Sequence, residues 1–379
     1  MSSRFIQIHA LSSYPAVLLN RDDTGMAKRM PFGGTSRLRI SSQCLKRHWR
    51  MVEDRWSLRE VGAPTGLRSR EIIEREVLPQ LRGKGAEDIV AATGLVFVKH
   101  LYGPKGTEIK NRQALLLGTP EITYLTKLAA EIVENASDAA DATKIAEELI
   151  KSQKANLSVM KEQAGNLAAG IEAALFGRMV TSDTDANTEA PIHVAHAISV
   201  HKEESENDYF TVVDDLTRRD GEGGSGGIFD TELTSGLFYS YVVVDVPGLV
   251  GNLGGDRALA GTVVEHLIHL IATVSPGAKR GSTAPYSYAD LMLVERGARQ
   301  PRSLANAFRK PVALTERRDA MESTIDALST HLSGLDAAYG AQEERDMLSV
   351  SGAVLPGISA PVALDALASK IADSIRASA

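Results

Sequence analysis

The spacing of apolar residues along the chain alternates between two repeat lengths. Short apolar or alternating stretches predict strands over Arg4–Leu11, Ile192–His201, Leu237–Val246 and Asp290–Glu295. Apolar residues three and four apart predict helices over 70–82, 86–101, 120–135, 138–152, 166–176, 256–274, 303–309, 316–333 and 362–377. Strands and helices are mixed irregularly, which predicts an α+β fold in preference to a doubly wound sheet.

One further amphipathic helix carries a basic face. Ser41 or Ser42 is a good N-cap, and the apolar positions that follow at helical spacing are Leu45, Trp49, Val52 and Trp56. Lys46 and Arg50 are four residues apart and share a second face. Together with the free N–H groups of the first turn, this face predicts a phosphate site. The alternative is a solvated basic face on an ordinary packing helix.

Charge is concentrated in the same part of the chain. The first fifty residues contain nine Lys or Arg and two Asp, whereas the whole chain of 379 residues carries a net charge of −6. A local basic segment on an acidic protein predicts a polyanion that docks in one place. Cys44 is the single cysteine, which fits a reducing compartment, and without a signal peptide or spanning segment we expect a cytoplasmic protein.

A polar insertion over 201–236 predicts a long hairpin arm. It holds ten acidic and three basic residues, with a glycine-rich run over 221–227. Tyr209, Phe210, Val212 and Val213 are apolar residues within this acidic segment. A lone two-stranded hairpin cannot bury them, so they pack on the parent domain, on another copy of the chain, or on nucleobases.

Motifs for catalysis and cofactor binding are weak. Asp22 and Asp23 are an acidic pair in the basic region and could hold a divalent metal beside a nucleic acid, although Asn-Arg-Asp-Asp is also ordinary turn chemistry. His193, His196 and His201 lack the spacing of metal ligands, and no nucleophile elbow is present. We therefore expect no metal and no cofactor.

A series of short segments gives a more specific indication. They are Leu19–Asp23, Phe32–Gly34, Arg39–Gln43, Leu45–Arg47, Gly177–Met179, Ala195–Ile198, Phe210–Leu216, Ser235–Tyr239, Asn252–Gly255, Pro276–Lys279 and Ser303–Phe308. In this order they resemble the CasC-type backbone subunit of type I-E CRISPR Cascade complexes. The resemblance extends from about residue 4 to 310, and the last seventy residues match less clearly.

The resemblance implies an architecture and an assembly. It implies an RRM-like (ferredoxin-like) palm in 1–60, 176–200 and 237–379, helical fingers in 61–175 and a β-hairpin thumb in 201–236. Copies of such a subunit polymerise along one CRISPR (guide) RNA, and each thumb displaces a nucleotide at a regular interval. The implied partners are further copies of the chain, other Cascade subunits, the target DNA strand and a recruited helicase–nuclease.

The resemblance also implies a set of RNA-binding residues. The groove for the RNA backbone comprises Arg21, Lys28, Ser41, Ser42, Gln43, Lys46 and Arg50, and Arg178 and Met179 also line the RNA. Tyr209, Phe210 and Val213 form the wedge in the RNA, with Tyr209 where family members commonly carry Trp. Because an aspartate in a similar loop of related type III subunits cuts RNA, a metal-dependent endoribonuclease acting through Asp22 and Asp23 is the alternative. Type I-E members are not expected to be enzymes.

Overall fold

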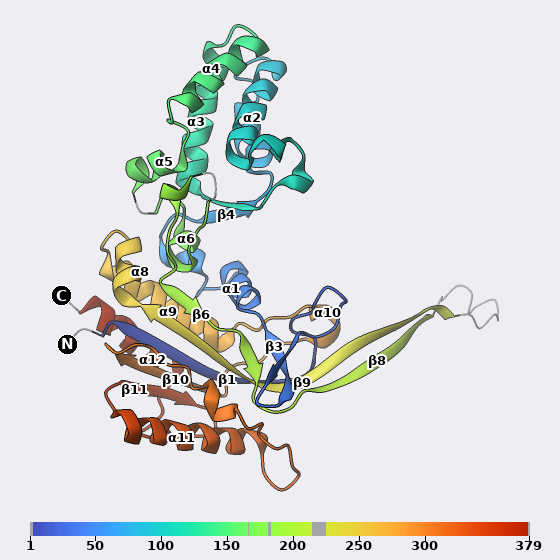
Figure 1. Ribbon diagram of the computed structural model, residues 1–379, viewed down its shortest axis with the longest axis vertical. Coiled ribbons are helices and arrows are strands. Elements are labelled where there is room, and N and C mark those ends of the chain that lie inside the picture. Colours follow the sequence, from blue (N-terminus) through green and yellow to red (C-terminus); the bar gives the residue numbers. More distant parts are fainter. Residues whose placement is uncertain (1–2, 166, 181–182, 214–224, 378–379) are drawn as a thin grey trace.

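An antiparallel sheet of nine strands forms the centre of the molecule (Figure 1). The computed structural model describes residues 3–165, 167–180, 183–213 and 225–377. The strand order is β11-β10-β1-β9-β7-β3-β2, and β6 and β8 also pair with β9. The strands are β1 (Phe5–Val17), β2 (Arg29–Phe32), β3 (Thr35–Ile40), β6 (Ile192–Val194), β7 (Ala197–Ser199), β8 (Glu204–Val213), β9 (Ser225–Asp245), β10 (Leu291–Gly297) and β11 (Glu344–Ser349).

Helices cover both faces of this sheet. Ile6 and Ile8 of β1 belong to a core with α9 (Arg257–Thr273) and α12 (Leu364–Arg376), whereas Leu11 belongs to the opposite core with α11 (Ala320–Tyr339). The change of face follows from the alternation of side chains along a strand. Helix α1 (Ser42–Met51) joins the first core through Leu45 and Trp49. The α+β class predicted from the sequence is thereby confirmed.

A helical region with its own core stands on one side of the sheet (Figure 1). It contains β4 (Gly66–Ser69), β5 (Leu115–Gly118), α2 (Glu87–Tyr102), α3 (Thr119–Asn135), α4 (Ala139–Lys151) and α5 (Leu157–Ala164), and α6 (Ile171–Phe176) leads back to the sheet. Strands β4 and β5 form a separate two-stranded sheet. Among the residues that the structure describes, no helix has the length and apolarity to cross a membrane.

The predicted hairpin arm is formed by β8 and the outer half of β9. Strand β9 is 21 residues long and runs from the central sheet into the arm without a break (Figure 1). Pairing of the two strands extends from Glu204 opposite Ser235 to Val213 opposite Ser225. At its foot, Arg29 of β2 forms ion pairs with Glu203 and with the buried Glu232. Residues 214–224, which include the first four positions of the glycine-rich run over 221–227, lie outside the described residues.

Several elements differ from the sequence-based expectations. No strand was predicted in 19–39, but this segment contains the β2–β3 hairpin, whose turn uses Gly33 and Gly34 at φ +64° and +82°. A Cβ at Gly33 would lie within bonding distance of the Arg309 carbonyl oxygen, so only glycine fits there. The helix expected over 70–82 is a π-helical turn, Ile73–Val77, followed by a 3-10 turn, Leu78–Leu81.

Helix boundaries also shift. Helix α1 ends at Met51, so Trp56 lies beyond it and stacks on His269 with ring centroids 3.6 Å apart. Helix α3 begins at Thr119 rather than at 120, with Gly118 as its N-cap, and α4 begins at Ala139 rather than at 138, because Asp138 is its N-cap. Strand β11 and the short helices α5, α8 (Val246–Asn252) and α10 (Arg280–Thr283) were not predicted. Each is short or polar, which weakens its hydrophobic pattern.

Candidate nucleic-acid interface

A cationic groove lies between α1 and the base of the helical region. Lys46, Arg47 and Arg50 line it from α1, and Arg68 lines it from β4. Its volume is about 380 Å³, and the other lining residues are Gln43, Leu116, Glu172, Phe176 and Gly177. The helical spacing of Lys46 and Arg50 does place both on one face, as the sequence predicted. Arg68 was not predicted, because it comes from a strand of the helical region.

The groove carries an excess of positive charge, because Glu172 is the one carboxylate among its lining residues and four of them are cations. Burial, and then the charge of Arg68, lowers the pKa of Lys46 and of Arg50. Lys46, Arg47, Arg50 and Arg68 form no ion pair with any residue in the described ranges. The carboxylate on the groove wall, Glu172, accepts a hydrogen bond from the Gly66 N–H. Repulsion among partly desolvated cations favours an anionic ligand.

The start of α1 contributes less to this groove than the sequence suggested. The Ser41 hydroxyl oxygen accepts a hydrogen bond from the Cys44 N–H at 3.3 Å and so caps the helix. The Ser42 N–H donates to Nδ1 of His196 at 3.3 Å. Both serines are buried. These first-turn groups therefore have partners inside the protein, and the cations on the side of α1 form the anion-binding surface.

The positive surface continues from α1 toward β3. Burial, followed by the charges of Arg39, Lys28 and Lys46, lowers the pKa of His196. The guanidinium of Arg39 donates to His196 Nδ1 at 3.2 Å, so the ring is a neutral acceptor between three cations. Arg21 is exposed in the loop before β2. A strip of cations thus connects the β2–β3 region to the groove.

Arg178 and Met179 have opposite environments. The Arg178 side chain is 2% exposed, and its Nη1 lies 2.7 Å from both carboxylate oxygens of Glu121. Its Nη2 donates to the Ala186 carbonyl at 2.9 Å. The expectation that the Arg178 side chain lines the RNA is therefore corrected: its charge is neutralised inside the protein. Met179 is 77% exposed and follows Gly177 of the groove by two residues.

The aromatic residues of the hairpin arm face solvent. Tyr209 is 64% exposed, and Phe210 and Phe229 are 42% and 50% exposed. Phe210 is paired across the strands with Phe229, and their rings stack with centroids 5.7 Å apart. The sequence reading missed Phe229, which lies on the returning strand. The backbone of Val213 ends β8, but its side chain lies outside the described part of the structure.

The acidic pair in the basic region is used in a turn. Oδ1 of Asp22 accepts hydrogen bonds from the Thr24 N–H and hydroxyl, at 2.9 Å and 2.7 Å, and from the Met26 N–H at 3.1 Å. The Thr24 hydroxyl is the main reason that the pKa of Asp22 is lowered. Over the described ranges, no group of three or more His, Cys, Asp or Glu residues is placed to hold a metal. This arrangement matches the turn alternative for Asp22.

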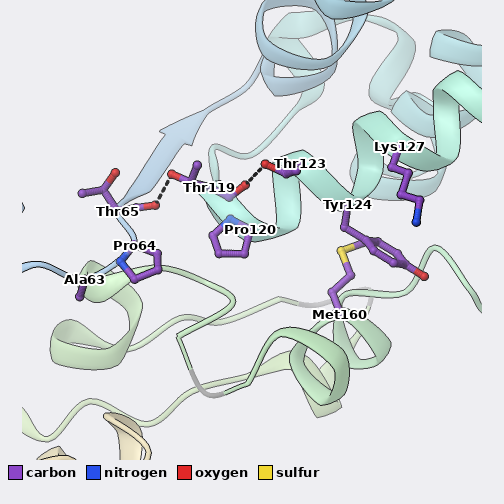
Figure 2. A pocket seen from close by; sticks show the side chains of 9 residues that line it. All are labelled: Ala63, Pro64, Thr65, Thr119, Pro120, Thr123, Tyr124, Lys127 and Met160. Atoms are coloured by element: carbon purple, nitrogen blue, oxygen red, sulfur yellow. Dashed lines mark hydrogen bonds between the residues drawn. The ribbon is translucent and has the colours of Figure 1, made fainter.

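A larger and more apolar pocket lies at the base of the helical region (Figure 2). Its volume is about 760 Å³, and it is lined by Ala63, Pro64, Thr65, Thr119, Pro120, Thr123, Tyr124, Lys127 and Met160. The Thr119 hydroxyl donates to the Thr65 carbonyl and the Thr123 hydroxyl to the Thr119 carbonyl, so both are already engaged. With one cation on its wall, this pocket is a poorer match for a phosphate chain than the groove.

Comparisons with known proteins support the broader part of the sequence resemblance, a similarity to subunits of CRISPR RNA-guided surveillance complexes. The family model for CT1975-like protein matches residues 6–375. One similar solved chain, from a "CRISPR RNA-guided surveillance complex, pre-nicking", has a TM-score of 0.79 and 25% identity, with 98% of this chain and 100% of that chain covered. Another, from a "CRISPR RNA-guided surveillance complex", has a TM-score of 0.68 and 23% identity, covering 97% and 99%. No curated protein matches significantly.

These similarities extend over nearly the whole chain. They include the last seventy residues, for which the sequence gave little indication. The antiparallel sheet with helices on both faces is consistent with the RRM-like fold that the resemblance implied. The chain belongs to the CT1975-like protein family.

Proposed function

We propose that this chain is a backbone subunit that binds CRISPR RNA in a type I-E Cascade complex. Copies of it polymerise along the RNA and display it for pairing with target DNA in antiviral defence. The observation that carries the proposal is the set of unpaired cations along α1 and β4. The family and the similarity to surveillance-complex subunits support it.

The groove suits a ligand of any sequence. Its cations offer charge to phosphate groups, and phosphate contacts position a strand without reading its bases. Target selection is then left to base pairing by the guide. The exposed aromatic residues Tyr209, Phe210 and Phe229 supply a wedge that a neighbouring copy of the chain brings to the same RNA.

We test the groove with Lys46→Ala combined with Arg50→Ala. Loss of two phosphate contacts weakens binding of single-stranded RNA, and the slope of log K against log salt becomes shallower by about 1.4. The measurement is a titration of labelled RNA at several salt concentrations. The matched control is Arg82→Ala with Lys84→Ala, which removes the same charge from an exposed turn of the helical region.

The control pair should bind RNA like the wild-type chain. Equal affinity and equal salt slope for the Lys46/Arg50 pair and the wild-type chain would contradict the proposal. A general effect of net charge would instead reduce binding of both variants equally.

The proposal assigns no catalytic step to this subunit, and cleavage of the target belongs to a recruited helicase–nuclease in the cytoplasm. Oδ1 of Asp22 accepts hydrogen bonds from Thr24 and Met26, which supports a role in the turn. We expect complementary RNA to stay intact when it is incubated with the RNA-loaded protein and Mg²⁺ or Mn²⁺, as judged on denaturing gels. Cleavage that is abolished by Asp23→Ala would establish the endoribonuclease instead.

A further inference from the structure

We infer that Tyr286 and Tyr288 form a stacking platform for bases of a single-stranded RNA, at the end of a second cationic groove. The two rings are 71% and 72% exposed. In the described parts of the chain, neither ring has an aromatic or cation contact and neither phenol has a hydrogen-bond partner. This inference rests on the proposed function and extends its site beyond the first groove.

The second groove lies on the other side of α1. Its volume is about 440 Å³, and Arg47 lines it as well as the first groove. Arg280 of α10 faces Arg47 across it, and the remaining lining residues are His48, Met51, Val52, Glu53, Val274 and Gly277. Arg47 therefore makes the two grooves one continuous cationic surface around α1.

His48, which also lines this groove, adds neither positive nor negative charge to that of the two arginines. Nε2 of His48 accepts from the Gly277 N–H at 3.4 Å, and Nδ1 lies 2.8 Å from the Cys44 carbonyl oxygen, to which it donates. This pattern is that of a neutral ring. Burial is the main cause that lowers the pKa of His48, and the charges of Arg280 and Arg47 lower it further. The hydrogen bond to Cys44 acts in the opposite direction. Glu53 is the single acidic residue among those that line the groove.

The two tyrosines belong to a segment that packs against the wall of this groove at Gly277. Pro285 packs against Gly277, because a Cβ at Gly277 would come within 2.5 Å of the Pro285 ring. From Pro285 to Ala289 the chain alternates between covered and exposed residues, with Tyr286 and Tyr288 at the exposed positions. Between them, Ser287 is fixed to Ser275 by hydrogen bonds of 2.9 Å in both directions. Both tyrosines are therefore exposed on either side of an anchored residue.

The position of the platform favours RNA over a protein partner. Lys279, which precedes α10, is hydrogen-bonded to Thr231 at the foot of the hairpin arm. The segment from Lys279 to Tyr288 thus joins the second cationic groove, through Arg280, to the foot of the arm, through Lys279. Exposed aromatic rings beside uncompensated cations are the usual means of holding a single strand without reading its sequence.

The test compares Tyr286→Ala/Tyr288→Ala with Tyr286→Phe/Tyr288→Phe in the full chain. The probes are a single-stranded RNA and a strand of equal length in which every base is replaced by an abasic residue. Loss of stacking should weaken RNA binding of the alanine pair by about tenfold, whereas the phenylalanine pair keeps the rings and binds like the wild-type chain. All three proteins should bind the abasic strand equally.

Each outcome separates the platform from the proposed function. If the wild-type chain binds RNA and the alanine pair binds it with the same affinity, the platform alone is overturned. The same holds if the alanine pair changes only the association of the chain with a protein. A loss of equal size on the abasic strand also overturns it, because the tyrosines would then contact the backbone. A wild-type chain that binds neither probe overturns the proposed function and the platform with it.

Discussion

Glu295 of β10 is a fully buried carboxylate that joins three elements. Its oxygens accept hydrogen bonds from Arg302, at 2.6 Å and 3.0 Å, and from Nε of Arg345 at 2.8 Å. Arg345 of β11 also makes a bidentate ion pair with Asp336 of α11, with both distances 2.6 Å. Burial alone would raise the pKa of Glu295, but hydrogen bonds and charges of His9 and Arg302 outweigh it and hold the pKa below 4.5.

We expect Glu295→Gln to lower the free energy of unfolding at pH 7 by about 3 kcal/mol, because it leaves buried arginines without their partner. The contribution of an acid with a lowered pKa is complete above its ordinary pKa and declines as the pH falls. The difference between wild-type and variant should therefore narrow below pH 4.5. Denaturant unfolding at pH 7, 4 and 3 measures this difference.

Glu344→Gln is the matched control. Glu344 pairs with Arg296 on the same β11–β10 ladder, but its side chain is 72% exposed, so its loss should cost less than about 1 kcal/mol. Equal effects of the two substitutions at pH 7, or a gap that widens toward acid, would contradict the role given to Glu295.

Individual cations could be found in the sequence, but their partners could not. Lys46 and Arg50 were predicted to share a face because local helical spacing determines it. Arg178 was expected to line the RNA, but its side chain is paired with Glu121. Because Glu121 lies 57 residues away in the chain, local sequence did not reveal this ion pair. Arg68 and Arg280 also reach α1 only through the tertiary fold. A charge pattern therefore identifies candidates, and long-range contacts decide which of them stay unpaired.

At the scale of elements, the hairpin arm is stabilised at its foot and not at its aromatic residues. Arg29 and Lys279 bond to the base of the arm through Glu203, Glu232 and Thr231. Further out, Phe210 and Phe229 stack only on each other among the described residues. The sequence left three packing partners open for the apolar residues of the arm. For Tyr209, Phe210 and Val212, which are 42–64% exposed, packing on the parent domain does not bury the side chain.

We expect Tyr209→Ala combined with Phe210→Ala and Phe229→Ala to leave the melting temperature of the isolated chain within about 2 °C of wild type. Little apolar surface is lost from the protein interior, because these rings are already exposed. The same variant should fail to assemble on a long RNA, as measured by native mass. Tyr209→Phe, which keeps the ring, is the control and should assemble normally. A large drop in melting temperature would show that the rings stabilise their own chain.

Strands were predicted where apolar residues dominate, and were missed where they do not. Strand β1 and the inner half of β9 are buried and were recognised. Strands β2 and β3 are short, and no strand was predicted there. Strand β11, at the edge of the sheet, begins with three charged residues, Glu344, Arg345 and Asp346, and therefore lacks an alternating apolar pattern. Pairing with a neighbour, which a single sequence does not reveal, stabilises these strands.

At the scale of the whole molecule, one side carries uncompensated positive charge although the chain as a whole is acidic. A net charge of −6 disfavours association of bare copies of the chain. Under the proposed function, a guide strand would neutralise the cationic grooves and bring the copies together. The assembly should therefore depend on RNA and on salt.

We expect the purified chain without RNA to be monomeric, and the native mass to rise in steps of 40.6 kDa per added protein as the RNA is lengthened. Salt near 1 M, where screening acts within about 3 Å, should dissociate these species. The measurement is native mass spectrometry with RNAs of graded length, and the Lys46→Ala/Arg50→Ala chain is the comparison. The proposal would be contradicted if the mass steps persist after ribonuclease has removed the RNA, or if the native mass does not depend on the length of the RNA.

Strand β9 has a mechanical consequence. Its inner residues belong to the central sheet, where they are paired with β1 on one side, while its outer residues carry the arm. No joint interrupts this 21-residue strand within its length. A displacement of the arm should therefore also move the part of β9 that lies in the central sheet. Amide exchange along β9 should slow gradually toward the sheet rather than change abruptly at a hinge.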